Sequence, residues 1–582
     1  MRRGLILFLF LCTMQSFGQL PPVFKDSSQF QEKDTRTRVF LSPKKVLWQS
    51  DVSGKYITGT EHLLKAGNGQ AELVNKDMVS LKSDDSVKPG ILLDFGKELH
   101  GGLQLVTGMM EKNALVKVRI RFGESASEAM ADIDTLTGAT NDHAIRDFII
   151  DLPWLGSLDL GNTGFRFVRI DLVEPNTTLL LKEVRAIFIF RDIPYLGSFK
   201  SSDERLNEIW ATGAYTVQLN MQQYLWDGVK RDRLVWVGDM HPEVMTISAV
   251  FGNNEVVPKS LDLIKDVTPL PAWMNGISSY SMWWIRIQRS WFLYQGDMAY
   301  LQKQQSYLKA LLQQLIGKVK GDREDLDGMR FMDWPTYENK VAIHAGLQAM
   351  MVMTLNDGAE LSRILGDEET ARSCEEAVSR LKKAIPDASN NKQAAALLAL
   401  AGLMPAKQAN DEIIAVGGTK DFSTFYGYYM LQAKALAGDY EGAMENIKTY
   451  WGGMLDLGAT SFWEDFDTSW MKDAARIDEL VPAGKVDVHA SYGAFSYKKL
   501  RHSLSHGWAS GPTSWLTEHV LGVKVMAPGS KVIKIEPHLG TLQFVEGTFP
   551  TPYGVVEIKH IRKADGTIKT KVKAPKGVKI IK

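Results

Sequence analysis

Hydrophobic and polar positions alternate with a period of two along the first third of the chain. The clearest runs are residues 115–122, 165–172 and 184–190, which are rich in Val, Ile and Phe and are separated by turn-forming residues. This alternation is typical of strands that bury one face. The pattern predicts an N-terminal antiparallel β-sandwich over residues 19–195.

The hydrophobic period changes after Ser201. Ser201 precedes Glu204 by three residues, which is the spacing of a helix capping box. Leu206, Ile209 and Trp210 then follow at helical spacing. We therefore expect a helical domain over residues 196–520.

Glycines punctuate the helical region at a regular interval. Gly366, Gly402 and Gly438 are 36 residues apart, and each follows an apolar stretch as a C′ glycine does. Asp367 and Asp439 are placed to cap the next helix. The interval predicts repeated helix hairpins, which either stack as an open solenoid or close into a ring.

The segments between the hairpins are long and rich in Trp, Gly and Asp, as in residues 273–278 and 331–337. Long loops of this kind are usually functional, which argues against a plain open array. Gly296-Asp297 repeats the punctuation 70 residues before Gly366. Beyond Leu521 short β-like runs return with proline breakers, so we expect a small C-terminal β-domain over residues 521–582.

The first 18 residues have the features of a signal peptide. Two arginines precede a short apolar run, and a small-residue cleavage pattern places the mature start near Gln19. The run is shorter than the roughly 20 residues that span a bilayer, so no membrane anchor is expected. Leu11 before Cys12 disfavours a lipoprotein. These features predict export to the periplasm or the extracellular space.

Composition narrows the classes of partner. Cys374 is the one cysteine left after cleavage, so no disulfide can form within the chain and we expect a buried thiol. Equal numbers of acidic and basic residues, 68 each, create no field that favours nucleic acid. The chain carries no phosphate loop, metal-binding pair or nucleophile elbow, so no cofactor or metal is expected. Nothing in the pattern specifies an oligomeric state.

Two segments concentrate residues suited to carbohydrate chemistry. Residues 226–243 gather Trp, Asp and Arg side chains, and residues 458–467 set Trp463 beside Glu464. Sugars are bound by aromatic faces and by carboxylates, and glycoside hydrolysis requires two carboxyl groups. A purely structural cluster of ion pairs is the alternative. His506, in a third segment, is either a polar sugar contact or a structural residue.

These segments resemble the motifs of the bacterial α-L-rhamnosidases. The segment of residues 226–243 resembles the family's Asp-x-x-x-Arg-Asp-Glu-Arg-x-Gly-Trp-x-Gly-Asp. The segment of residues 458–467 resembles its Gly-Ala-Thr-Thr-x-Trp-Glu. Ser503-x-x-His506 is similar to the family's Ser-x-Asn-His. Further similarity appears in residues 94–101, in Asp333-Trp334 and in Pro528-Gly529 with Pro537. The order and spacing agree over nearly the whole mature chain.

The resemblance implies an (α/α)₆ toroid flanked by an N-terminal and a small C-terminal β-sandwich. It implies an inverting glycosidase that releases a terminal rhamnose-like deoxy sugar from plant or microbial glycans, with Glu464 as the base that activates water. The residues it assigns to sugar binding are Asp227, Arg231, Trp236, Asp333, Trp334, Trp463 and His506.

One departure concerns the proton donor. Arg231-Asp232-Arg233 is one residue shorter than the family's Arg-Asp-Glu-Arg, and the missing residue is the glutamate usually assigned as the acid. Either Asp232 or Asp239 donates the proton, with a pKa raised by burial or by a neighbouring carboxylate. Alternatively, the chain acts on another sugar by another mechanism, or binds sugar without cleaving it. A non-enzymatic scaffold of helical repeats would instead expose an open apolar groove.

Overall fold

A computed structural model describes residues 34–111 and 114–581 of the chain. The predicted signal peptide, residues 1–18, lies outside the described residues. Within the described ranges, no helix combines the length and apolar character needed to cross a membrane.

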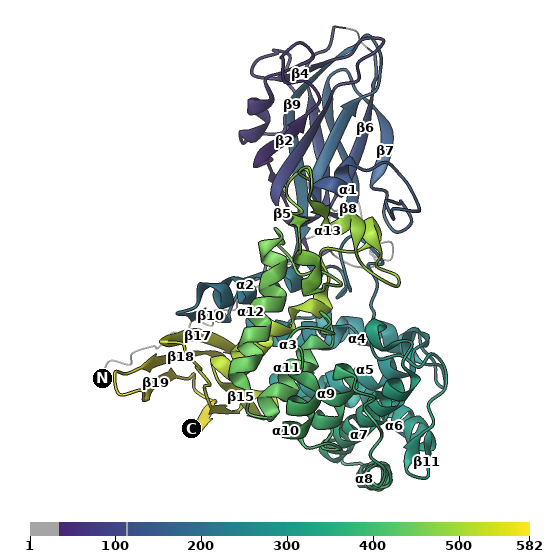
Figure 1. The fold of residues 1–582 in the computed structure, drawn as a ribbon, viewed down its shortest axis with the longest axis vertical. Coiled ribbons are helices and arrows are strands. Elements are labelled where there is room, and N and C mark those ends of the chain that lie inside the picture. Colours follow the sequence, from purple (N-terminus) through teal and green to yellow (C-terminus); the bar gives the residue numbers. More distant parts are fainter. Residues whose placement is uncertain (1–33, 112–113, 582) are drawn as a thin grey trace, which may run out of the picture. The chain divides into compact units, whose positions relative to one another are not determined.

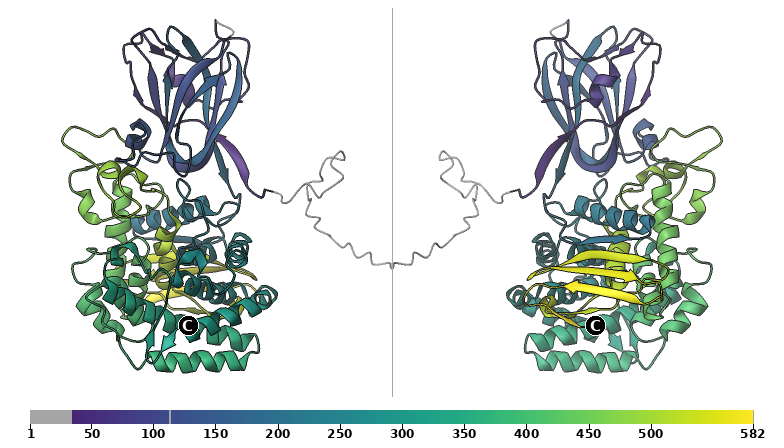
Figure 2. Two further views of the ribbon diagram at one scale, coloured as in Figure 1. Left: turned by 90° about the vertical axis from the view of Figure 1, so that its right-hand side faces the viewer. Right: turned by 90° about the vertical axis from the view of Figure 1, so that its left-hand side faces the viewer.

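The N-terminal region is an antiparallel β-structure wrapped around its own apolar core (Figures 1 and 2). Its nine-stranded sheet has the order β3-β4-β9-β5-β8-β6-β7, with β1 added to β9 and β2 to β5. The alternation seen in the sequence buries Val118 and Ile120 on one face. The strands are β1 (Thr37–Leu41), β2 (Lys45–Gln49), β3 (Ile57–Thr58), β4 (Val79–Lys82), β5 (Gly90–Thr107), β6 (Val116–Gly123), β7 (Asp147–Leu152), β8 (Gly156–Leu172) and β9 (Thr178–Phe190).

A short helix directly after β6 contacts the helical domain. Ser125 caps α1 (Ala126–Met130) by accepting a hydrogen bond from the backbone N–H of Glu128. The backbone N–H of Ala126 donates across to the carbonyl of Ile477 at 2.9 Å. The turn that holds Glu124 and Glu128 is thereby fixed against a loop of the helical domain.

The helical domain is a closed ring. Helices α3, α5, α7, α9, α11 and α14 each pack on the next, and α14 packs back on α3. This cycle confirms the toroid and excludes the open array, because an open solenoid leaves its first and last hairpins apart. The helices are α2 (Glu204–Asn220), α3 (Met240–Val250), α4 (Val256–Asp266), α5 (Ser278–Gln295), α6 (Met298–Gly317), α7 (Lys340–Ile364), α8 (Glu368–Leu381), α9 (Lys392–Leu400), α10 (Ala406–Ala409), α11 (Gly427–Leu436), α12 (Tyr440–Asp456), α13 (Val488–Ser491) and α14 (Gly511–Trp515).

The inner helices differ from the outer ones in composition. Inner helices such as α7 are apolar on nearly all sides and are buried over most of their length. Outer α8 is amphipathic, and its apolar face includes Cys374, a fully buried free thiol whose pKa burial raises to about 12. An all-round apolar helix needs neighbours on every side, which fits the inner layer of a two-layer ring.

The glycine punctuation is confirmed. Gly366, Gly402 and Gly438 end their helices at φ of +79°, +66° and +82°, a region that favours glycine. Asp367 and Asp439 accept hydrogen bonds from the first turns of α8 and α12, as N-caps do. The sequence therefore located these helix boundaries correctly.

The predicted capping box at Ser201 is wrong by two residues. Asp203 is the N-cap of α2 and accepts from the backbone N–H groups of Arg205 and Leu206. Ser201 ends strand β10 (Ser198–Ser201), and its backbone N–H donates to Asn207 at 2.7 Å. Aspartate caps a helix as well as serine does, and Asp203 directly precedes the first residue of α2.

Strand β10 belongs to a sheet formed mainly by the end of the chain. The four-stranded sheet has the order β10-β17-β18-β19, and a three-stranded sheet has the order β15-β16-β20. The strands are β15 (Val523–Ala527), β16 (Val532–Ile535), β17 (Phe544–Thr551), β18 (Gly554–Arg562), β19 (Ile568–Lys573) and β20 (Lys579–Ile581). Two-stranded pairs form from β11 (Val319–Lys320) with β12 (Arg323–Glu324) and from β13 (Ala474–Ala475) with β14 (Val486–Asp487).

Candidate active site

A pocket of about 240 Å³ opens at one end of the ring. Its walls come from loops that precede the inner helices α3, α5, α7 and α14, so the N-terminal ends of these helices converge on it. The pocket is lined by Asp227, Arg231, Asp232, Trp236, Asp239, Asn275, Ile277, Tyr280, Met329, Phe331, Trp334, Glu464, Ser496, His506 and Trp508. Apolar walls with a few convergent polar groups are typical of small-molecule sites.

Most of the residues predicted from the sequence meet here. The predicted site residues that line the pocket are Asp227, Arg231, Asp232, Trp236, Asp239, Trp334, Glu464 and His506. They come from segments spread over residues 227–506, and the toroid brings them together. The structure does not bring Asp333 and Trp463 into this lining.

Glu464 is buried and is held at both carboxylate oxygens. Its Oε1 forms an ion pair with Nη2 of Arg231, and its Oε2 accepts the backbone N–H of Ser503 at 3.2 Å. The backbone N–H of Glu464 donates in return to the carbonyl of Ser503 at 3.0 Å. The guanidinium and the backbone N–H together fix the orientation of this carboxylate.

Asp239 stands in the opposite electrostatic setting. It precedes α3, but its side chain does not cap that helix; Oδ1 instead accepts the hydroxyl of Tyr280 at 2.7 Å. Burial, with a smaller contribution from the charge of Glu464, raises the pKa of Asp239 well above its usual value. Asp239 therefore keeps its proton where an exposed aspartate would lose it.

Asp232 lies in the shortened part of the motif, where the backbone is unusual. Asp232 and Arg233 both adopt left-handed φ values, +58° and +54°, which few residues other than glycine adopt. The Asp232 carboxylate accepts from Nε1 of Trp236 at 3.2 Å and lies 3.5 Å from Nη1 of Arg231. Nδ1 of His143, from the β-region, lies 3.2 Å from Oδ1, the same oxygen that Arg231 approaches.

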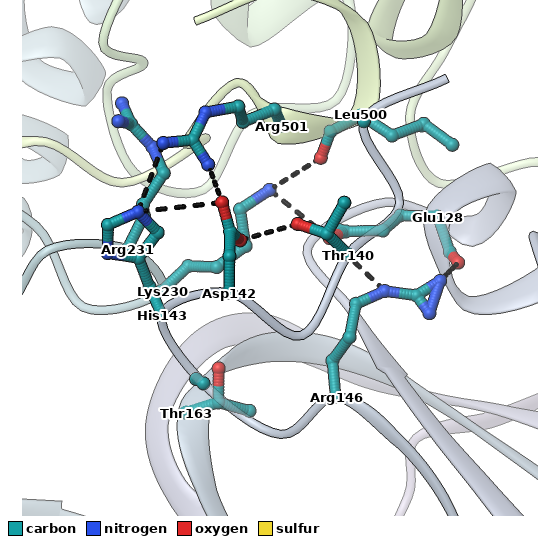
Figure 3. Close-up of a pocket in the computed structure, with 12 residues that line it drawn as sticks. Glu128, Thr140, Asp142, His143, Arg146, Thr163, Lys230, Arg231, Leu500 and Arg501 are labelled. Carbon is teal, nitrogen blue, oxygen red and sulfur yellow. Dashed lines mark hydrogen bonds and ion pairs between the residues drawn. The ribbon is translucent and has the colours of Figure 1, made fainter. Parts of the chain in front are cut away.

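His143 is fixed by its own neighbours. Its Nε2 lies 3.0 Å from Nη2 of Arg501, and Arg501 is also ion-paired with Asp142 (Figure 3). The side chain of Arg233 donates to the carbonyls of His143 and Asn162 at 3.1 and 2.9 Å. The β-region thus supports Asp232 from outside the pocket lining.

Asp227 and His506 form the polar floor of the pocket. Burial, followed by the charges of Asp232 and Asp239, raises the pKa of Asp227 well above its usual value. Burial, followed by the charge of Arg231, lowers the pKa of His506 to about 3, so the ring is neutral. Nε2 of His506 lies 3.8 Å from Asp227 and 3.9 Å from Glu464, distances beyond a direct hydrogen bond.

Several pocket residues were absent from the predicted site. Asn275 accepts the backbone N–H of Val237 and donates to the carbonyl of Val235, both at 3.1 Å, so it holds the backbone on either side of Trp236. Nε1 of Trp508 donates to the carbonyl of Glu464 at 2.9 Å. The predicted functional loop of residues 273–278 includes Asn275 and Ile277, whereas Tyr280 and Ser496 gave no sequence signal.

Asp333 and Trp463 support the pocket from behind. Asp333 accepts from Ser423 at 2.5 Å and from the backbone N–H of Trp334 at 2.9 Å, and burial raises its pKa to about 6. Trp463 is 1% exposed and packs edge-to-face on Phe466. Among the described residues, no group of three or more His, Cys, Asp or Glu side chains is arranged to hold a metal ion.

Removing the Arg231 guanidinium should expose the cost of burying Glu464. We expect Arg231→Met to lower the free energy of unfolding by about 3–5 kcal/mol, because an unpaired buried charge remains. The double variant Arg231→Met/Glu464→Gln should recover most of that loss. Urea unfolding followed by circular dichroism measures both.

Arg205→Met, which removes the half-exposed partner of Asp456, is the control and should cost no more than about 1 kcal/mol. Equal costs for Arg231→Met and Arg205→Met would contradict the expectation.

Comparison with known proteins identifies two domains. Residues 194–415 match the family model of the bacterial alpha-L-rhamnosidase 6 hairpin glycosidase domain, and residues 522–581 match that of the bacterial alpha-L-rhamnosidase C-terminal domain. An alpha-L-rhamnosidase of Alteromonas sp. (strain LOR) is 26% identical over 530 residues, which cover 82% of this chain and 54% of that protein.

Solved structures share the fold. The GH78 family rhamnosidase of Bacillus sp. GL1 has a TM-score of 0.71 at 19% identity, covering 87% of this chain and 54% of its own. A rhamnosidase from Klebsiella oxytoca with rhamnose bound has a TM-score of 0.64 at 18% identity, covering 83% of this chain and 96% of its own.

The chain spans about half the length of the Alteromonas and Bacillus relatives. The part it shares with them contains the helical ring and both flanking sheet regions, which confirms the predicted fold class. Residues 194–415 are thus a bacterial alpha-L-rhamnosidase six-hairpin glycosidase domain and residues 522–581 are the C-terminal domain of the same type, which confirms the resemblance predicted from the sequence.

Proposed function

We propose that the chain is a glycoside hydrolase that releases a terminal rhamnose-like deoxy sugar from plant or microbial glycans, with inversion at the anomeric carbon. The name of the Alteromonas relative and the rhamnose bound to the Klebsiella protein support this sugar class. The size of the pocket, about 240 Å³, suits a single terminal sugar rather than an internal stretch of chain.

The observation that carries the proposal is the opposite setting of two pocket carboxyl groups. Glu464 is paired with Arg231 and is suited to act as a base. Asp239 is desolvated, its pKa is raised, and it is suited to act as an acid. A pair of carboxyl groups in such different environments, one paired with a cation and the other desolvated, suits an acid and a base. Glycoside hydrolysis requires such a pair.

The contacts of Asp232 favour a different role. Nε1 of Trp236 donates to its Oδ2 at 3.2 Å, and Nη1 of Arg231 and Nδ1 of His143 lie 3.5 and 3.2 Å from its Oδ1. Asp232 is thus placed to orient Arg231 and Trp236, whereas Asp239 has the raised pKa that a proton donor needs. We therefore assign proton donation to Asp239 and the orientation of Arg231 and Trp236 to Asp232.

The reaction then follows from these positions. Asp239 transfers its proton to the glycosidic oxygen while the bond to the anomeric carbon breaks. Glu464 takes a proton from water, and the water oxygen bonds to the anomeric carbon from the opposite face. Tyr280 stabilises the carboxylate that forms on Asp239, because its hydroxyl already donates to Oδ1. Exchange with solvent restores both protonation states.

The remaining pocket residues account for sugar binding. Asp227, Arg231 and neutral His506 present acceptors and donors to sugar hydroxyls at the floor, where the 3.8 and 3.9 Å gaps accept a hydroxyl between them. The rings of Trp236, Trp334 and Trp508 offer apolar faces. Ile277, Met329 and Phe331 give an apolar wall suited to the methyl group of a deoxy sugar.

The acid assignment is tested with two leaving groups. On a rhamnosyl disaccharide, Asp239→Asn should lose about 10²–10⁴-fold in kcat, because general acid catalysis contributes that much. On a nitrophenyl rhamnoside, whose leaving group needs no proton, the loss should be under about tenfold. On that substrate the basic limb of the pH profile should also vanish, since activity normally falls as pH rises through the Asp239 pKa. Release of free sugar measures each rate.

Glu464→Gln is the matched variant for the base and should lose activity on both substrates. If Asp232→Asn rather than Asp239→Asn shows the dependence on leaving group, Asp232 is the acid and our assignment fails. If the intact protein binds rhamnose but releases no sugar from any glycoside, the chain is a sugar-binding member of the family and not a hydrolase.

Inversion predicts the stereochemistry of the first product. A single displacement turns an α-L-rhamnoside into β-L-rhamnose, which then mutarotates slowly. Proton NMR recorded in the first minutes of hydrolysis should show the β-anomer before the α-anomer. An initial excess of the α-anomer would establish retention and would require a nucleophile in place of a base.

We also propose that the chain is exported to the periplasm or the extracellular space. The charged start, short apolar run and cleavage pattern of residues 1–18 support this. Expression of the full chain in a bacterium, followed by N-terminal sequencing of the protein outside the cytoplasm, should give a start at Gln19. Retention of the intact N-terminus in the cytoplasm would contradict export.

A further inference from the structure

Lys230, the residue before Arg231, lies in a buried junction between the β-region and the helical ring. Its ammonium lies 3.1 Å from Oε2 of Glu124 and 3.2 Å from Oε1 of Glu128. It also donates to the carbonyls of Leu500 and His502 at 3.1 and 2.7 Å. Figure 3 shows Lys230 among Glu128, Leu500 and Arg231. One side chain thus joins the turn after β6, the loop of Arg231 and the segment before Ser503.

Glu124 is fully buried and grips the segment that holds Glu464. Its Oε2 accepts the backbone N–H of Leu504 at 2.6 Å, and its Oε1 accepts the hydroxyl of Ser503 at 3.3 Å. The backbone N–H of the same Ser503 donates to Oε2 of Glu464. The dipeptide Ser503-Leu504 is therefore clamped between a carboxylate of the pocket and a carboxylate of the β-region.

Ser125 holds the same segment through a second set of hydrogen bonds. Its hydroxyl lies 2.7 Å from Nδ1 of His489, and Nε2 of His489 lies 2.9 Å from the carbonyl of His502. The carbonyl can only accept, so Nε2 carries the proton and Nδ1 accepts from the serine hydroxyl. Two consecutive residues of the β-region, Glu124 and Ser125, thus fix three consecutive residues beside the base.

The energetics of the junction indicate that its buried ions fix the positions of loops rather than add stability. Burial raises the pKa of Glu124 to about 7, even though the charge of Lys230 acts in the opposite direction. Burial acts to lower the pKa of Lys230, but the charges of Glu124 and Glu128 outweigh it and raise that pKa. A buried ionic cluster gains little net stability over apolar packing of the same volume. What this cluster does provide is a fixed position for two loops.

We propose that Glu124, acting with Lys230, is a positioning residue for the base. Glu124 sets the Ser503 N–H that binds Oε2 of Glu464, and Lys230 sets the adjoining Arg231 that binds Oε1. The β-region thereby completes the active site without touching the substrate. This inference rests on the proposed function, because it assigns Glu464 the role of base.

The test compares Glu124→Gln with a matched carboxylate of the same β-region. Glutamine keeps the size of Glu124 but turns an amide toward the Lys230 ammonium, so the clamp should shift. We expect kcat to fall about 10–100-fold with KM changed less than about threefold, since a displacement near 1 Å can cost about 10²-fold. Glu124→Asp, which keeps the charge, should recover part of kcat.

Asp147→Asn is the control. Asp147 is also buried, and it pairs with Arg119 through contacts of 2.8 and 2.6 Å on β7 and β6, away from the pocket lining. Asp147→Asn should lower the melting temperature but leave kcat unchanged.

In Glu124→Gln the acidic limb of kcat/KM should move to higher pH, because a base that loses its donors holds its proton more tightly. A change in stability alone would not move that limb.

A second measurement separates this inference from the proposed function. Hydrogen exchange of residues 500–508 reports the clamp whether or not the protein cleaves a glycoside. Glu124→Gln should exchange faster in this segment than the intact protein, and Asp147→Asn should not. If the intact protein releases no sugar, the proposed function fails and exchange still judges the clamp. Unchanged exchange, or wild-type kcat and pH profile in Glu124→Gln, would overturn the inference.

Discussion

The buried guanidinium of Arg231 is the interaction on which the rest of the site depends. A charge out of water is costly unless carboxylates compensate it, so Arg231 must lie between Glu464 and Asp232. Its neighbour Lys230 is buried too and pairs with Glu124 in the β-region. Two successive cations thus link the pocket to the domain junction, and neither loop can move without exposing an unpaired charge.

The sequence predicted the helices and strands better than it predicted the closure of the helices into a ring. Glycines such as Gly366 mark helix ends by their backbone conformation, which is a local property and legible in the sequence. The packing of α14 on α3 closes the ring, yet the same 36-residue period would serve an open array. The pairing of β10 with β17 also joins segments more than 300 residues apart, and no local pattern encodes it.

The candidate site was predictable where chemistry gathers in one segment. Residues 226–243 were predicted as part of the site because charged residues and Trp are concentrated there. Tyr280 did not, because it is one aromatic residue in an apolar helix, and its role comes from the 2.7 Å contact with Asp239. Trp463 adjoins Glu464 in sequence but packs into the core while Glu464 faces the pocket. Glu124 lies in another domain, so only the folded chain shows its connection to Glu464 through Ser503.

The shortened motif and the proposed acid are held by different parts of the structure. Within the motif, Asp232 and Arg233 take left-handed conformations that cost roughly 1–3 kcal/mol each. The two carbonyl contacts of Arg233 help to hold this turn, which directs Asp232 to Trp236 and His143. The position of Asp239 does not depend on this turn, because Asp239 directly precedes α3 and its hydroxyl partner Tyr280 belongs to α5. The proposed proton donor is therefore the carboxyl group that the packed helices of the ring position.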